Sequence, residues 1–191
     1  GIPLVLTTHS LEPLRPWKVE QLGNAYHLSS WIEHNGITQA DAIIAVSQET
    51  RNDVLRLFPV DPDKVKVIHN GIDLAHFSAA AVADSAQGLR RQLGFQDDDL
   101  VIGVCAGFRE EKRQVDLLDA LQRLRAGGLP AKALLVGDGL MRPQIEARRD
   151  ALGLADAVAL AGFQQDVRPY VAACDVMALT SHAETFPIST L

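Results

Sequence analysis

The sequence predicts an α/β fold of two Rossmann-like parallel-sheet units, because apolar, strand-like runs alternate with amphipathic, helix-like segments along most of the chain. The strand-like runs are apolar throughout, a pattern typical of parallel strands that are buried on both faces. An alanine-rich stretch over residues 76–97 interrupts the alternation. We therefore expect one unit over residues 1–75, a linker over 76–97 and a second unit over 98–191.

In the first unit, strands are expected to alternate with helices. The predicted segments are, in chain order, a strand at 3–8, a helix at 26–39, a strand at 42–46, a helix at 48–58 and a strand at 65–69. The first helix has Leu28, Trp31 and Ile32 on one side, and Ser47 is a typical N-cap for the second. A polar loop with several prolines is expected over 11–23.

The second unit repeats the alternation more regularly. Its predicted strands are 100–106, 131–136, 157–160 and 175–179, and its predicted helices are 112–125, 141–152 and 166–173. Gly127 and Gly153 follow the two longer helices, as glycines commonly do at helix ends. A short helix is also expected at 84–93, inside the linker, with Gly94 ending it.

The composition indicates a globular protein and argues against several classes of function. Hydrophobic residues make up 47% and charged residues 22% of the 191 residues. The net charge of −6 argues against a nucleic-acid partner, which would favour a basic face. No apolar run approaches the roughly 18–20 residues of a membrane span, so we expect a cytoplasmic chain, at most peripheral at a membrane. Cys105 and Cys174 have no metal-ligand spacing and are expected to be buried thiols.

Ligands of open α/β sheets bind at the carboxyl ends of the strands, so the residues that follow each strand are the candidates. Arg109 and Lys112 follow the strand at 100–106 and place positive charge at a helix start, where a phosphate is their natural partner. A solvated loop with internal ion pairs is the alternative. Gly137 and Gly139 follow the next strand, where they either let the backbone approach a ligand or simply make a tight turn.

Two titratable side chains follow other strands. His9 comes directly after the first strand, where a histidine can reach into a cleft and titrate near neutrality, although a structural histidine is the alternative. Glu184 lies in a polar segment after the last strand. Pro187 suits the first turn of a helix that would begin in this segment.

Several of these segments together resemble the GT-B glycosyltransferases of family GT4. Residues 172–176 with 181–187 are similar to the family's AAADV…PS…E-[GT]-F-[GP] stretch, residues 108–124 to R-P-E-K-x-x-x-x-L-L-x-A-L, residues 135–139 to LVGDG, and residues 68–77 to NGVD…F. Residues 8–23 are similar to GT4 glycogen synthases of the actinobacterial type. The order of the motifs along the chain makes the resemblance specific.

The resemblance implies two GT-B units, both incomplete in this chain. It implies a retaining glycosyltransferase that moves a hexose, glucose, from an ADP- or UDP-linked donor to a glycan or other hydroxyl acceptor, with no metal and no cofactor. The second glutamate of the family's E-x7-E motif would follow Leu191. The isolated chain is therefore expected to be weakly active or inactive.

The resemblance also implies a role for each candidate residue. His9 would face the anomeric carbon of the donor sugar, and Glu184 would bind the sugar hydroxyls. The residues expected to hold the donor diphosphate are Arg109, Lys112, Pro187, Ile188, Ser189 and Thr190. The residues expected to line the nucleotide site are Gly137, Gly139, Phe163 and Val167.

Two alternative functions remain open, and one motif argues for neither. A GT-B sugar-nucleotide 2-epimerase would share the architecture. A non-catalytic nucleotide-sugar-binding module is favoured by Gly107, which stands where many family members have an arginine. Asp61 and Asp63 form a DxD pattern, by which some glycosyltransferases hold a divalent metal. Because they precede a strand and enclose a proline, we expect a loop turn there and no metal site.

Overall fold

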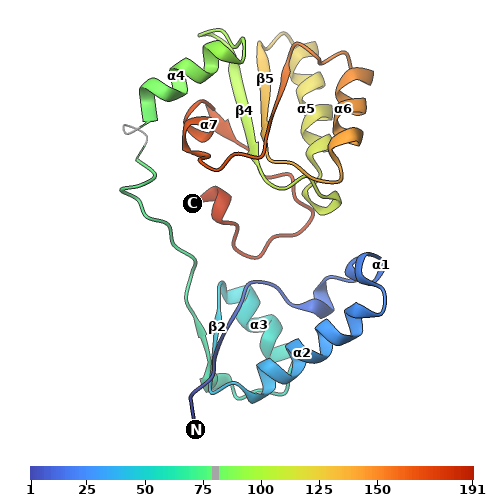
Figure 1. Cartoon of the computed structure of the whole chain (residues 1–191), viewed down its shortest axis with the longest axis vertical. Coiled ribbons are helices and arrows are strands. Elements are labelled where there is room, and N and C mark those ends of the chain that lie inside the picture. The colour runs from blue at the N-terminus through green and yellow to red at the C-terminus, as the bar shows by residue number, and fades with distance from the viewer. Residues whose placement is uncertain (79–81) are drawn as a thin grey trace. The chain divides into compact units, whose positions relative to one another are not determined.

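The computed structural model describes residues 1–78 and 82–191, which form two compact units (Figure 1). The first unit comprises Gly1–Gly71 together with Glu184–Ile188, and the second comprises Ile72–Ala183 together with Ser189–Leu191. Each unit contains one parallel sheet with helices packed against it. This arrangement confirms the predicted α/β class.

The sheet of the first unit has the strand order β1-β2-β3. β1 spans Val5–Thr8, β2 spans Ala42–Ala45 and β3 spans Val65–Val67, so each predicted strand is present and shorter than expected. Ile43 on the central strand pairs with Val65, and both side chains are buried. The core of this unit is therefore built around β2.

Four short or medium helices and two 3-10 turns complete the segment before the second unit's sheet. They are η1 (Glu12–Leu14), α1 (Lys18–Leu22), α2 (Ala25–Gln39), α3 (Gln48–Leu57), η2 (Pro62–Lys64) and α4 (Ala83–Gln92). The Ser47 Oγ accepts a hydrogen bond from the Thr50 N–H at 3.0 Å, which confirms the predicted N-cap of α3. The loop predicted over 11–23 is wrong in part, because η1 and α1 form inside it.

The apolar side of α2 is mostly exposed, which the sequence pattern did not indicate. Leu28, Trp31 and Ile32 are 59%, 63% and 56% exposed. Ile37 is the buried residue of this helix, and it packs with β2 and with the buried Val54 and Phe58. Only the second half of α2 thus reaches the core of the unit.

The sheet of the second unit has the strand order β6-β5-β4-β7, with all pairs parallel. β4 spans Leu100–Cys105, β5 spans Ala131–Val136, β6 spans Val158–Gly162 and β7 spans Val176–Met177. β4 and β5 pair along their whole length, from Leu100 opposite Ala131 to Cys105 opposite Val136. The predicted strands are therefore all present.

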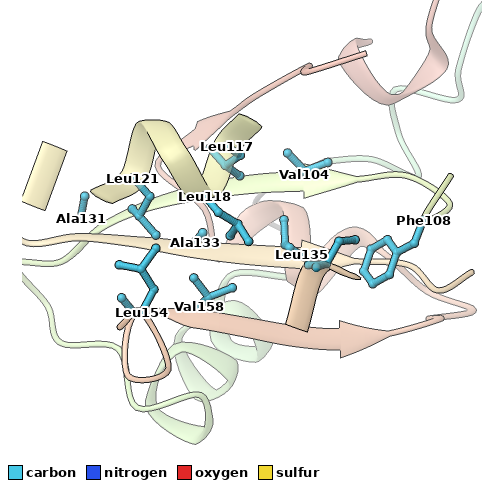
Figure 2. Close-up of a cluster of buried hydrophobic side chains, with 12 residues drawn as sticks. Val104, Phe108, Leu117, Leu118, Leu121, Ala131, Ala133, Leu135, Leu154 and Val158 are labelled. Carbon is cyan, nitrogen blue, oxygen red and sulfur yellow. The ribbon is translucent and has the colours of Figure 1, made fainter. Parts of the chain in front are cut away.

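Helices cover both faces of this sheet (Figure 1). On one face, α5 (Gln114–Ala126) and α6 (Arg142–Ala151) pack against Leu135, and Leu118 and Leu121 of α5 point toward β5 (Figure 2). On the other face, α4 and α7 (Arg168–Ala172) pack around Leu134. Neighbouring residues of β5 thus point to opposite faces, which explains why this strand is apolar throughout.

The start of α5 differs from the prediction for a local backbone reason. The sequence predicted a helix from residue 112, whereas Lys112 ends the 3-10 turn η4 (Glu110–Lys112) and α5 begins at Gln114. Arg113 between them has a φ of 49°, in the left-handed region. A residue in this conformation cannot continue a right-handed helix, so the turn and the helix are separate.

The two cysteines are free and partly buried beside β4. Gly103 leaves the necessary room, because a Cβ atom there would lie 2.5 Å from the Cys174 Sγ and 2.7 Å from the Met177 Sδ. Burial is the main cause that raises the pKa of Cys174 to about 12, and it also raises the pKa of Cys105. Both thiols are therefore protonated at neutral pH.

Residues of the predicted linker pack onto the second unit. Ala86 of α4 is buried, and Arg90 donates from Nη1 to the Ala173 carbonyl oxygen at 3.1 Å. Residues 79–81 of the predicted linker lie outside the described residues, and the domain limits at 75 and 98 stay a prediction. In the described parts of the chain, no helix has both the length and the apolar character that crossing a bilayer requires.

Candidate functional site

The carboxyl ends of β4 and β5 bring two loops of the second unit into backbone contact. Ala106 donates its N–H to the Val136 carbonyl at 3.0 Å, and Phe108 donates to the Asp138 carbonyl at 2.9 Å. Met141 then donates to the Phe108 carbonyl at 3.1 Å. The loop that contains Arg109 and Lys112 therefore lies directly beside the turn that contains the predicted glycines.

Gly137 and Gly139 make this close approach possible. Their φ values are 139° and 154°, which side chains rarely adopt. A Cβ atom on Gly137 would overlap the Ala106 carbonyl oxygen, and one on Gly139 would overlap the Phe108 carbonyl oxygen. Contact between the two loops is sufficient to explain both glycines, and their contact with a nucleotide stays a prediction.

The turn after β5 is fixed by charged side chains as well. Asp138 accepts a hydrogen bond from the Gly139 N–H at 2.8 Å and pairs with Arg142 Nη1 at 3.1 Å. Arg142 also pairs with Glu146 at 2.8 Å, and this bond is the main cause that raises the pKa of its guanidinium. The start of α6 is therefore held in a fixed position relative to the turn.

The loop over 107–113, which we call the cation loop, is anchored by Phe108, whose side chain is fully buried. Arg109 is exposed, and among residues 1–78 and 82–191 its guanidinium has no carboxylate partner. Its Nε lies 3.7 Å from the position that a Cβ of Gly107 would take. The Arg109 side chain thus passes beside the place where a side chain at position 107 would begin.

The loop after β7 is bound to the cation loop. The Thr180 hydroxyl donates to the Lys112 carbonyl oxygen at 2.7 Å, and the His182 N–H donates to the Glu111 carbonyl oxygen at 2.8 Å. The Glu111 Oε2 atom is buried without a hydrogen-bond partner among the described residues. Residues far apart in the sequence therefore surround Lys112.

A pocket lies beside the cation loop, between the starts of α5 and α6. Its lining is made up of Arg109, Glu110, Arg113, Gln114, Val115, Met141, Gln144 and Ile145. Arg113 is held by Asp116 through bonds of 2.6 and 2.9 Å, and this pairing raises the pKa of its guanidinium. Since Arg113 is already paired, Arg109 is the cation of the pocket that remains able to bind an anion.

Phe163 and Val167, both expected to line the nucleotide site, differ in their surroundings. Phe163 follows β6 and is 80% exposed, so the face of its ring is accessible. Gly162 before it accepts a hydrogen bond from the Gly137 N–H at 2.9 Å, which places this loop at the same sheet edge. Val167 instead packs against the buried cluster between α4 and α7.

His9 lies in the first unit at the end of β1 and is exposed. The segment after it is held by side chains of α2: the Glu12 N–H donates to both oxygens of Glu33, at 3.1 and 2.9 Å, and the Tyr26 hydroxyl donates to the Glu12 carbonyl at 3.0 Å. Glu12 itself is buried and pairs with Lys18. Sequence reasoning did not single out Glu12, which lies within the motif at 8–23, or Glu33, which has no sequence signal of its own.

The segment Glu184–Ile188, which contains three predicted site residues, clusters with the first unit. The Asn70 amide donates to the Phe186 carbonyl at 2.9 Å, and the His69 ring stacks on the Phe186 ring with centroids 4.9 Å apart. Ser189 belongs to the second unit, and the side chain of Thr190 lies outside the described residues. The predicted site residues are thus divided between the two units.

The DxD pair forms a turn. Asp61 accepts a hydrogen bond from the Asp63 N–H at 2.9 Å and caps η2, ahead of β3. Within the described ranges, no group of three or more His, Cys, Asp or Glu side chains is arranged to hold a metal ion. Neither aspartate is therefore placed as part of a candidate site.

Comparisons with known proteins identify two matching family models. Residues 86–191 match the model described as "Glycosyl transferases group 1", and residues 1–76 match "Glycosyltransferase Family 4". The α-maltose-1-phosphate synthase of Mycolicibacterium smegmatis is 62% identical over 74 residues, which are 38% of this chain and 19% of that protein. The enzyme of the same name from Mycobacterium tuberculosis is 44% identical over 126 residues, 65% of this chain and 32% of that protein.

A third curated relative aligns along the whole chain. The D-inositol 3-phosphate glycosyltransferase of Stackebrandtia nassauensis is 27% identical over 205 aligned residues, which cover 100% of this chain and 45% of that protein. The chain therefore spans between about a fifth and a half of the length of the curated relatives it matches.

Solved structures share the fold. HepE of Anabaena in complex with UDP-glucose superposes with a TM-score of 0.75 and 28% identity, covering 96% of this chain and 48% of that one. WaaG, a glycosyltransferase involved in lipopolysaccharide biosynthesis, superposes with a TM-score of 0.72 and 19% identity, covering 97% and 52% of the two chains. Both comparisons support the parallel α/β architecture described above.

Proposed function

Because the chain belongs to the glycosyl transferases group 1, we propose that it contributes to a retaining glycosyltransferase that moves a hexose, glucose, from a nucleotide sugar to a hydroxyl acceptor. The observation that supports this proposal most directly is the cation loop, which presents Arg109 and Lys112 at the carboxyl edge of the second sheet. HepE, which shares the fold at 28% identity, has been solved with UDP-glucose.

Glycosyl transfer from such a donor requires a nucleoside diphosphate to leave while its negative charge is stabilised. We assign this task to the side chains of Arg109 and Lys112. The path of the Arg109 side chain beside Gly107 supports the assignment, because Arg109 can supply a charge near the position where many family members have an arginine. The backbone of Pro187–Thr190 would add donors through the N–H groups of Ile188, Ser189 and Thr190, with no metal required.

The other predicted site residues are assigned to the base and to the sugar of the donor. The exposed ring of Phe163 is suited to stack on the base, beside the turn of Gly137 and Gly139. We assign Glu184 to the hydroxyls of the donor sugar and His9 to the face of the reacting carbon. Val167 contributes to the shape of the base site through its packing with α7.

The proposed acceptor is suggested by the product for which one relative is named. The relative that is 62% identical over 74 residues is named for a product, α-maltose-1-phosphate, which is a phosphorylated glucose disaccharide. Transfer of an α-glucosyl group to the 4-hydroxyl of α-glucose 1-phosphate would form that product. We therefore propose α-linked glucose compounds as acceptors, with glucose 1-phosphate tested beside glycogen.

The first experiment measures binding of UDP and ADP to this chain by calorimetry, with Lys112→Ala as the test variant. Losing a charge-assisted contact should weaken binding by about 1.5–3 kcal/mol. Arg123→Ala, an exposed cation in the last turns of α5, is the matched control and should change nothing. Equal affinity of Lys112→Ala and the native chain would contradict the phosphate assignment.

A second experiment distinguishes transfer from the alternative functions. The protein that contains this chain is incubated with UDP-glucose or ADP-glucose, with and without acceptor, and the sugars are analysed. Acceptor-dependent release of nucleoside diphosphate supports transfer. An epimerised nucleotide sugar formed without acceptor would identify a 2-epimerase, and tight binding with no change of the donor would identify a binding module.

A further inference from the structure

We propose that Gln114 is a positioning residue: its buried amide holds the cation loop in the shape that presents Arg109 and Lys112 to a diphosphate. The proposal rests on the proposed function for the identity of the ligand. Its structural part, the hold of Gln114 on the loop, can be tested without any ligand.

Gln114 is a polar side chain in an apolar position. It is 1% exposed at the first residue of α5, on the same stripe as the buried Leu117, Leu118 and Leu121. Burying an amide costs free energy unless it is hydrogen-bonded. The Gln114 Nε2 donates to the Gly107 carbonyl oxygen at 3.1 Å, so its donor is used to bind the beginning of the cation loop.

This bond joins the first residue of α5 to Gly107, the first residue of the cation loop. The Gly107 carbonyl also accepts the Arg109 N–H at 3.0 Å, so two donors converge on one oxygen at the point where the chain leaves β4. Inside the loop, Lys112 donates its N–H to the Arg109 carbonyl at 3.1 Å. The Gln114 side chain thus fixes a turn that contains both cations, of which Arg109 is exposed and Lys112 is half-buried.

The other anchors of the loop act at different points. Phe108 binds the neighbouring turn through its N–H, while Thr180 and His182 bind the carbonyls of Lys112 and Glu111. None of these contacts is made to the Gly107 carbonyl oxygen itself, although the Phe108 N–H lies in the same planar peptide unit and limits its movement. Without the Gln114 amide, the Gly107 carbonyl oxygen would retain the Arg109 N–H as its donor. The less restrained loop would then have to be ordered when a diphosphate binds.

The test uses Gln114→Met, which keeps the length of the side chain and removes its donor. Hydrogen exchange of the Lys112 and Arg113 amides, both bonded within the loop, should become about tenfold faster. Affinity for ADP or UDP should fall by about tenfold, the scale of one lost buried hydrogen bond. Leu117→Met on the same stripe of α5 is the control, because it alters the same core and removes no hydrogen bond to the loop.

A second variant gives a signature that a purely structural role would not produce. In Gln114→Glu, a carboxylate would face the Gly107 carbonyl at neutral pH and repel it, whereas the protonated acid could donate to it. Nucleotide affinity of this variant should therefore recover relative to the native chain as pH falls from 8 toward 5.

Each result decides one of the two proposals. Faster loop exchange with weaker nucleotide binding in Gln114→Met, but not in Leu117→Met, supports the positioning role. Unchanged loop exchange, or equal changes in both variants, overturns it. If the native chain binds neither ADP nor UDP, the proposed function fails, and the exchange measurement still decides whether Gln114 holds the loop.

Discussion

At the residue scale, Gly137 and Gly139 show why a position beside another backbone requires glycine. In the sequence they are a short glycine pair that either turns tightly or approaches a ligand. In the structure their backbones press against the carbonyls of Ala106 and Phe108. The two glycines therefore allow the neighbouring turn to pack against the cation loop, and the Gln114 amide binds the same loop through the Gly107 carbonyl.

A Gly137→Ala variant should lower the free energy of unfolding by about 2–5 kcal/mol, because it combines a strained φ with overlap of the Ala106 carbonyl. Urea denaturation followed by circular dichroism measures the change. Gly153→Ala is the matched control, since Gly153 has a φ of 66° but open space around it, and the cost there should be about 1 kcal/mol. Equal costs at both positions would show that the overlap is relieved by movement of the loop.

The pKa of Glu33 is raised by the surroundings of its side chain. Burial raises the pKa of its carboxyl most strongly; the Glu12 N–H opposes this effect, and the Glu12 charge adds to it. A raised folded-state pKa means that the stabilising contribution is present below the unfolded pKa, near 4.5, and is lost as pH rises through the folded value.

The Glu33→Gln variant tests this direction. The native protein should lose stability relative to the variant as pH rises from about 4 to 7, and thermal melting of both proteins at each pH measures the difference. Other titrating groups cancel in the comparison because both proteins contain them. A difference that does not change with pH would show that Glu33 is not desolvated.

At the element scale, the helical pattern of α5 predicted the helix but not its first residue. Its leucine periodicity correctly predicted a helix against the sheet, yet its first residue was placed too early because the left-handed backbone of Arg113 has no strong sequence signal. Gln114 on the apolar stripe was a signal that could have been used, since a glutamine at a core position needs a buried partner. The partner itself, the Gly107 carbonyl, could be identified only in the structure.

Arg90 binds helix α4 to residues around the second sheet by hydrogen bonds, in addition to the apolar contacts of the helix. The side chain of Arg90 donates to the Ala173 carbonyl at 3.1 Å, to the Asp99 carbonyl at 2.8 Å and to Asp175 at 3.1 Å, and it is 18% exposed. Arg90→Ala should destabilise the protein by about 2–4 kcal/mol, because it removes the donor that the Ala173 and Asp99 carbonyls share and the ion-pair partner of Asp175.

The neighbouring Arg91 is the control for this prediction. It is exposed and bonds only within its own helix, to the Gln87 carbonyl, so Arg91→Ala should change stability by less than about 0.5 kcal/mol. Chemical denaturation of both variants provides the measurement. A small effect of Arg90→Ala would mean that α4 is held by its apolar face alone.

At the scale of the whole molecule, the proposed function draws residues from both units. His9 is the test residue of the first unit because it is exposed at the end of β1. In the protein that contains this chain, His9→Ala should lower kcat by about 100-fold while donor affinity changes less than about threefold, as expected for a group that acts at the reacting carbon.

His27 on α2 is an exposed histidine of the same unit, and His27→Ala serves as the control with unchanged kinetics. Steady-state kinetics and donor binding are measured side by side. If donor affinity falls as much as kcat, His9 binds the donor sugar and has no separate role in the chemical step.

The fold class, the positions of the strands and the strand ends where a ligand would bind can all be predicted from the sequence, because burial on both strand faces and helical periodicity depend on residues that are close together in the chain. The side chains that contact one another across the fold are known from the structure. In the structure, Leu28 and Trp31 of α2 are exposed, the Phe186 ring stacks on His69, and the Gln114 amide binds the Gly107 carbonyl. The physical reason is that burial and hydrogen bonding depend on partners brought together from distant parts of the chain, and local periodicity does not specify those partners.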